Sequence, residues 1–245
     1  NEMKWLAIVV CGFMCGDLFA QKIDVWVENF PPYGYEENGQ LAGLSTEITR
    51  ALVKDSGIQV GTWKIAPWAR AFVMAQRNPN TLLYTVVRQP DREQLFHWIG
   101  PISDRKLYLY KLRSRTDIEL NSLEDAKNYS VGSVINTSSN QYLKSLGIAT
   151  EDVPQYKQNL LKLVAGRVDL VDSLAPSLRF IAEKEHIDIS ELEKAILVDG
   201  SKKYYIVLNI NTSRDIVEPL QKSFSKLMKS GRLMELQRKY LYSEL

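Results

Sequence analysis

The order of apolar and polar positions predicts an α/β protein from about residue 22 onward. Short apolar runs rich in β-branched residues predict strands at residues 22–27, 60–65, 82–87, 107–112, 129–134, 168–171 and 204–210. Apolar positions three or four residues apart predict helices at residues 41–55, 69–76, 138–146, 160–165, 216–229 and 232–240. Because strands and helices alternate early in the chain, we expect a parallel sheet with right-handed crossovers.

Capping signals refine these boundaries. Ser122 with Asp125, and Ser190 with Glu193, form the Ser-x-x-acid pattern that caps helical turns. The polar run at residues 113–121 indicates where the chain leaves one lobe and enters another. We therefore expect two lobes.

Residues 1–20 have the character of a secretory signal peptide preceded by two extra residues. Lys4 provides the positive start, residues 5–14 the apolar segment, and residues 18–20 a cleavage site that ends in a small residue. The apolar run is too short to span a bilayer, although an uncleaved membrane anchor is the alternative. We expect export to the periplasm.

Composition excludes several functional classes. Both cysteines, Cys11 and Cys15, lie in the predicted signal peptide, and neither follows the small residue that a lipoprotein cleavage box requires. The mature chain would then form no disulfide or thiolate metal site. His97 and His186 are far apart, which gives no support for a catalytic histidine or a metal cluster, and a formal net charge of +2 gives no nucleic-acid signature. We expect no metal, no cofactor and no nucleic-acid partner.

A series of short motifs resembles the family-3 extracellular solute-binding proteins, the amino-acid-binding group of ABC importers, over most of residues 22–240. The motifs occur in the family's order at residues 30–33 (Phe-Pro-Pro-Tyr), 38–43 (Asn-Gly-Gln-Leu-Ala-Gly), 89–92 (Gln-Pro-Asp-Arg), 131–138, 166–169 (Gly-Arg-Val-Asp) and 231–240. A divergent branch of the family is indicated by the sequences at residues 68–70, 88–92 and 96–101.

The resemblance implies the type II periplasmic binding protein fold. Two lobes, each a mainly parallel sheet flanked by helices, would be joined by hinge strands at residues 107–112 and 204–208. Residues 21–110 and 206–245 would form the first lobe, and residues 111–205 the second. The ligand would lie between the lobes of a monomer.

Three arginines at strand ends or in loops are candidates for holding an anionic group, because the planar guanidinium donates two parallel hydrogen bonds to a carboxylate. They are Arg70, Arg88 and Arg92. The resemblance implies that Arg92 matches the family's carboxylate-binding arginine, although Gln89 replaces the usual threonine of that motif. The alternative is a surface arginine paired with a neighbouring acidic residue.

Other candidates would complete the ligand site. Trp68 either faces the cleft or packs in the first lobe. Thr137 and Ser138 open a helix, where backbone N–H groups and hydroxyls either receive a ligand oxygen or serve only as an N-cap. Phe30 and Tyr33 either stack on the ligand or form a local hydrophobic staple.

Whether the site can bind a ligand with an ammonium group depends on its acidic residues. Members of the family place an acid five positions after the aspartate that corresponds to Asp169, and here that position is Leu174. Asp172 shares a strand face with Leu174 and could replace the missing acid after a small shift, and Glu28 at the end of the first strand is a second candidate. If neither meets an ammonium group, the ligand is a carboxylate, a nucleobase-like compound or another polar metabolite.

The resemblance implies a binding protein and not an enzyme. We expect it to capture a small polar ligand, an amino acid or a related carboxylate, by lobe closure for import through an inner-membrane ABC permease. The alternatives are a sensory module that binds a membrane receptor, or a dehydratase on the same fold with Glu28 and Asp172 as acid and base.

Overall fold

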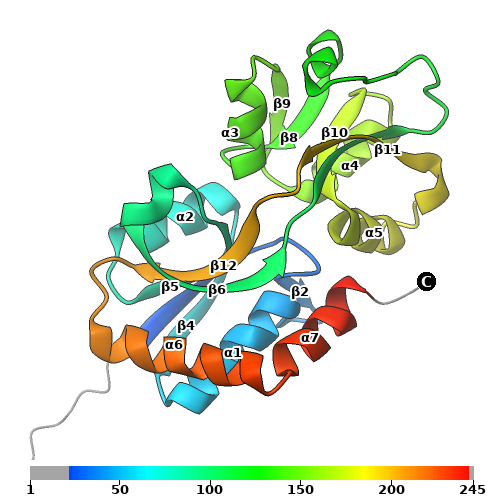
Figure 1. Cartoon of the computed structure of the whole chain (residues 1–245). Coiled ribbons are helices and arrows are strands. Elements are labelled where there is room, and N and C mark those ends of the chain that lie inside the picture. The colour runs from blue at the N-terminus through cyan, green and yellow to red at the C-terminus, as the bar shows by residue number, and fades with distance from the viewer. Residues whose placement is uncertain (1–21, 243–245) are drawn as a thin grey trace, which may run out of the picture.

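A computed structural model describes residues 22–242, which form two lobes, each built on a five-stranded sheet (Figure 1). The predicted signal peptide, residues 1–20, lies outside the described residues. Within residues 22–242, no helix has both the length and the apolar composition needed to cross a membrane.

The first lobe contains both ends of the described chain. Its sheet has the strand order β4-β1-β5-β12-β6, with β1 (Lys22–Glu28), β4 (Gln59–Ala66), β5 (Thr81–Val87), β6 (Phe96–Asp104) and β12 (Lys203–Asn209). The helix α2 (Trp68–Arg77) lies on the opposite side of the sheet from α1 (Leu44–Ser56), α6 (Arg214–Lys229) and α7 (Arg232–Leu241) (Figure 1). Smaller elements are β2 (Tyr35–Glu37), β3 (Gln40–Ala42) and the 3-10 helix η1 (Pro90–Leu95).

The second lobe is formed by the middle of the chain. Its sheet has the order β11-β7-β10-β8-β9, with β7 (Leu107–Leu112), β8 (Val131–Val134), β9 (Thr150–Val153), β10 (Leu170–Leu174) and β11 (Leu192–Asp199). The helices are α3 (Ser138–Ser145), α4 (Tyr156–Val164) and α5 (Ala175–Lys184), with the 3-10 helices η2 (Leu123–Asn128) and η3 (Ile189–Glu191).

The predicted fold class is confirmed: in each sheet four strands run in one direction and one strand runs against them. In the first lobe β1 runs parallel to β4 and β5, whereas β12 runs antiparallel to β5 and β6. In the second, β10 is parallel to β8 but antiparallel to β7. The antiparallel pairs arise because the chain crosses between lobes twice, from β6 to β7 and back from β11 to β12 (Figure 1).

The pairing of the strands next to the two crossings can be compared with the predicted lobe boundaries. All of β7 pairs with the second sheet, and all of β12 pairs with the first. We propose that the lobes meet at residues 105–106 and 200–202, a few residues from the boundaries expected at 110–111 and 205–206.

The burial of side chains explains why the clearest apolar patterns in the sequence form the predicted strands and helices. Every residue of β5 is buried, because helices cover both faces of this central strand. In α1 the residues Leu44, Ile48 and Leu52 repeat every four positions and are buried on one helix face. The capping box of Ser122 with Asp125 is present, but Asp188, and not Ser190, caps η3 by accepting a 2.9 Å hydrogen bond from the backbone N–H of Ser190.

The first loop is fixed against the start of α1. Backbone N–H groups of Leu44 and Ser45 donate to the carbonyl oxygens of Pro32 (2.9 Å) and Tyr33 (2.8 Å). Gly43 permits this approach, because its φ is 113° and a Cβ there would lie 2.5 Å from the Tyr33 oxygen. The loop that carries Phe30 is therefore held rigidly at the edge of the first lobe.

Candidate ligand-binding site

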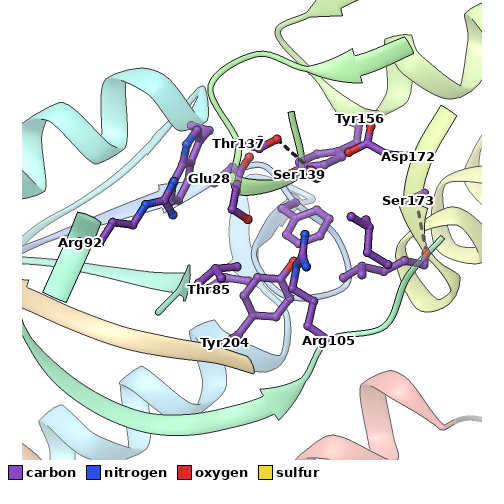
Figure 2. Close-up of a pocket in the computed structure, with 16 residues that line it drawn as sticks. Glu28, Thr85, Arg92, Arg105, Thr137, Ser139, Tyr156, Asp172, Ser173 and Tyr204 are labelled. Atoms are coloured by element: carbon purple, nitrogen blue, oxygen red, sulfur yellow. Dashed lines mark hydrogen bonds between the residues drawn. The ribbon is translucent and has the colours of Figure 1, made fainter. Parts of the chain in front are cut away.

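A cavity lies where the two lobes meet (Figure 2). It has a volume of about 410 Å³, which includes solvent at its mouth. The lining residues come from both lobes and from the crossings between them. They are Glu28, Phe30, Trp68, Thr85, Val87, Arg92, Arg105, Leu107, Thr137, Ser138, Ser139, Tyr156, Asp172, Ser173, Leu174 and Tyr204.

The structure brings together seven of the ten residues expected at a ligand site. Those seven come from separate parts of the chain and are Glu28, Phe30, Trp68, Arg92, Thr137, Ser138 and Asp172.

The other three lie elsewhere. Tyr33 is buried behind the cavity wall, where its ring stacks on Phe30 with the centroids 5.1 Å apart. Arg70 is exposed and lies 5.7 Å from the ring centroid of Trp26. Arg88 is exposed and donates from Nε to Glu93 at 2.8 Å, so its charge already has a partner.

Arg92 is the cation of the first lobe in this cavity. Its side chain is buried, so the surface-arginine alternative does not hold. The guanidinium lies 4.9 Å from the ring centroid of Phe72 and 5.4 Å from that of Trp68, and its Nη2 donates to Oε1 of Gln141 across the lobes at 3.3 Å. Burial lowers the pKa of Arg92 to about 10, and Nη1 has no hydrogen-bond partner.

The start of α3 faces Arg92 from the second lobe. Thr137 is the N-cap, and its hydroxyl accepts from the backbone N–H of Asn140 at 3.2 Å while also lining the cavity. The N-cap role expected for Thr137 is therefore confirmed, and its contact with a ligand stays a prediction. Ser138 and Ser139 follow at the first turn, where backbone N–H groups lack partners within the helix.

Two carboxyl groups lie in the same cavity. Burial raises the pKa of Glu28 to about 8, although the hydrogen bond with Tyr156 and the charge of Arg92 oppose this shift. Burial also raises the pKa of Asp172, against a hydrogen bond with Ser139.

Asp172 reaches the cavity in regular strand register. It pairs with Leu109 of β7, and Leu174, two residues on, lines the same cavity. The bulge considered from the sequence is therefore not needed to bring Asp172 to this face.

Three larger side chains of the cavity escaped the sequence reasoning. Arg105 is buried at the crossing from β6 to β7, and its Nη1 donates to Oδ2 of Asp199 at 3.0 Å. Tyr204 hydrogen-bonds to Arg105, and burial raises the pKa of this tyrosine to about 12. Tyr156 stacks on Phe30 with 4.2 Å between ring centroids. The charged run at residues 104–106, directly before the predicted hinge strand at residues 107–112, was the available signal for Arg105.

Thr85 marks a strained point in the cavity wall. Its φ is 62°, a left-handed conformation that β-branched residues rarely adopt. The strain occurs where the register of β5 against β12 shifts between Tyr205 and Val207, and a 2.9 Å hydrogen bond with Ser45 holds the side chain. Such strain is concentrated at functional sites.

The lobes contact each other directly around the cavity. Nε1 of Trp68 donates to the carbonyl oxygen of Asn136 at 2.8 Å, and Nζ of Lys184 lies 2.8 Å from Oε1 of Glu37. The lobes are therefore in a closed arrangement. Within residues 22–242, no group of three or more His, Cys, Asp or Glu side chains is placed to hold a metal ion.

The fold is shared with proteins of known structure. A histidine kinase sensor domain with similarity to periplasmic binding proteins superposes with a TM-score of 0.80 at 19% identity, covering 90% of this chain and 96% of that one. An ancestral arginine-binding protein bound to glutamine gives 0.78 at 20% identity, covering 90% and 97%. At these identities the likeness establishes the fold.

Sequence comparisons point the same way. The probable amino-acid-binding protein YxeM of Bacillus subtilis (strain 168) is 22% identical over 230 residues, which cover 87% of this chain and 81% of YxeM. The model of the bacterial extracellular solute-binding proteins, family 3, matches residues 23–243. With the fold and an interlobe cavity of this kind, the chain belongs to the bacterial extracellular solute-binding proteins, family 3.

Proposed function

We propose that this protein captures a small α-amino acid between its lobes and delivers it to an ABC permease of the inner membrane. The carboxylate of the ligand lies against Arg92 and the start of α3, and its ammonium group lies against Asp172. The similarity to a probable amino-acid-binding protein supports the same ligand class.

The observation that carries this proposal is the state of Arg92. Its guanidinium is buried and Nη1 has no hydrogen-bond partner; the ion pairs formed by residues 22–242 do not include it. A buried charge without a counter-ion is costly, and a ligand carboxylate removes that cost.

Closure of the lobes couples ligand binding to transport. The lining residues come from both lobes, so the full set of contacts forms only when the lobes meet. A ligand that binds the closed arrangement more tightly shifts the open–closed equilibrium toward it, and the permease then distinguishes loaded from empty protein. On this account the protein acts as a monomer in the periplasm after its signal peptide is removed.

A sensory role is the second candidate, favoured by the likeness to a histidine kinase sensor domain. The cavity and its closure would be the same, but the closed form would bind a membrane receptor. Genes for a permease or for a kinase next to this one would distinguish the two roles.

A thermal-shift screen tests the proposal. The purified protein is heated with single amino acids, organic acids, purines and small peptides, because a ligand that binds only the native state raises the melting temperature. We expect one amino acid or a small group of them to raise it and to be recovered unchanged. A response confined to purines or peptides would contradict the ligand class, and consumption of the compound would show an enzyme.

A further inference from the structure

The cavity holds a second buried guanidinium in addition to Arg92. Arg105 enters from the crossing between β6 and β7, whereas Arg92 enters from η1 of the first lobe (Figure 2). Each arginine is 3% exposed. Two cations from different elements thus face one small space.

Each guanidinium has one nitrogen without a hydrogen-bond acceptor. These donors are Nη1 of Arg92 and Nε of Arg105, and both are buried. Arg105 already forms an ion pair with Asp199 through Nη1, so its Nε is a separate, unused donor. A buried donor from a charged group is costly to leave unpaired, so each of these two lining arginines is short of an acceptor.

The protein's own carboxyl groups do not supply both acceptors. Asp91 and Glu28 are the acids whose charges act on Arg92, but neither forms an ion pair with it, and burial raises the pKa of Glu28 to about 8. Asp172 lies beside Tyr156 (Figure 2) and forms none of the ion pairs found in residues 22–242. Asp172 therefore remains available for a cationic group of the ligand.

Charge narrows the choice of ligand further. A ligand whose side chain is a cation, such as arginine, would bring that charge toward Arg105 and be disfavoured. A neutral amide side chain would leave the Arg105 donor without an anionic partner.

Resting on the proposed function, we propose that the ligand is an acidic α-amino acid, glutamate or aspartate, with one carboxylate on Arg92 and the second on Arg105. The first carboxylate also meets the start of α3, and Asp172 receives the ammonium group. Arg105 is then the residue that selects an acidic side chain.

Titration calorimetry with glutamate, aspartate, glutamine, asparagine and arginine tests this assignment. We expect the wild-type protein to bind one acidic amino acid roughly 10- to 150-fold more tightly than its amide, the range of a hydrogen bond to a charged group. R105Q should bring that ratio close to one, while the exposed variant R88Q should leave it unchanged.

These measurements distinguish a failure of the role of Arg105 from a failure of the proposed function. Tighter binding of glutamine, asparagine or arginine than of the acids, or an unchanged acid-to-amide ratio in R105Q, would overturn the role of Arg105 and leave the proposed function intact. No binding of any amino acid by the folded protein would overturn the proposed function itself. If R105Q does not fold, R105K keeps a cation beside Asp199 but lacks Nε, and a lowered ratio in R105K is then the expected result.

Discussion

Trp68 in the first lobe donates a 2.8 Å hydrogen bond from its indole Nε1 to the carbonyl oxygen of Asn136 in the second. The same indole forms the ring surface under Arg92, 5.4 Å from the guanidinium carbon. One side chain therefore both positions the proposed carboxylate clamp and holds the lobes together.

Trp68→Phe should weaken closure while keeping an aromatic ring beside Arg92. Loss of one neutral hydrogen bond should reduce the stability of the closed arrangement, and with it ligand affinity, by about 0.5–1.5 kcal/mol. Small-angle X-ray scattering without ligand should show a larger radius of gyration. Trp98→Phe is the matched control, because its indole donates to Glu93 within the first lobe. Equal effects of the two variants would argue against a role of the Trp68 hydrogen bond in holding the lobes together.

Arg92→Ala should weaken ligand binding by roughly 1.5–3 kcal/mol, the contribution of a hydrogen bond to a charged group. Titration calorimetry on the folded variant measures this loss. Arg88→Ala serves as control, because Arg88 is exposed and paired with Glu93, and its affinity should change by less than about 0.5 kcal/mol. Unchanged affinity in R92A would remove Arg92 from the site.

Asp172→Asn tests recognition of the ammonium group. The substitution keeps the size of the side chain but removes its charge, so binding of the amino acid should weaken by roughly 10- to 150-fold. An analogue of that amino acid that lacks the amino group should have the same affinity for the wild-type protein and for D172N. If both ligands lose affinity by the same factor, Asp172 supports the cavity wall and does not meet the ammonium group.

Glu28 should make the stability of the ligand-free protein fall as pH rises. Its pKa is raised from 4.5 to about 8, so between these values the folded state keeps a proton that the unfolded state has lost. The free energy of unfolding should decrease through this range by up to about 1.4 kcal/mol per pH unit and level off above about pH 8.

Glu28→Gln should remove most of this dependence and be more stable than wild type above about pH 8. A smaller slope of the same sign should remain, because burial also raises the pKa of Asp172. Urea denaturation from about pH 5 to about pH 9 compares the two proteins. Parallel curves would show that the Glu28 carboxyl is not desolvated in the folded state.

The sequence predicted an element best where its burial follows a simple pattern, either along one face or along the whole element. β5 is buried throughout, and α1 and α6 each have one buried face, so their periods are clear. β6 and β11 were missed, because their burial alternates irregularly and Gly100 with Pro101 interrupts β6. Each of them pairs within a single sheet, β6 with β12 in the first lobe and β11 with β7 in the second, and the chain crosses between the lobes directly after each strand.

The site was predictable where a motif fixed it. Arg92 and Thr137 stand in motifs of the family, and both line the cavity. Arg105 and Tyr156 come from segments without a motif, and only the approach of the two lobes brings them to the same space. Arg88 has the same chemistry as Arg92 four residues away, but it faces Glu93, a difference of orientation that sequence spacing does not encode.

A crystal structure of the protein with the compound that raises its melting temperature most would test the central claim directly. We expect the compound between closed lobes, with a carboxylate within hydrogen-bond distance of Arg92 and the start of α3, and an ammonium group on Asp172. A compound bound elsewhere, or one in this cavity whose carboxylate does not touch Arg92, would contradict the account.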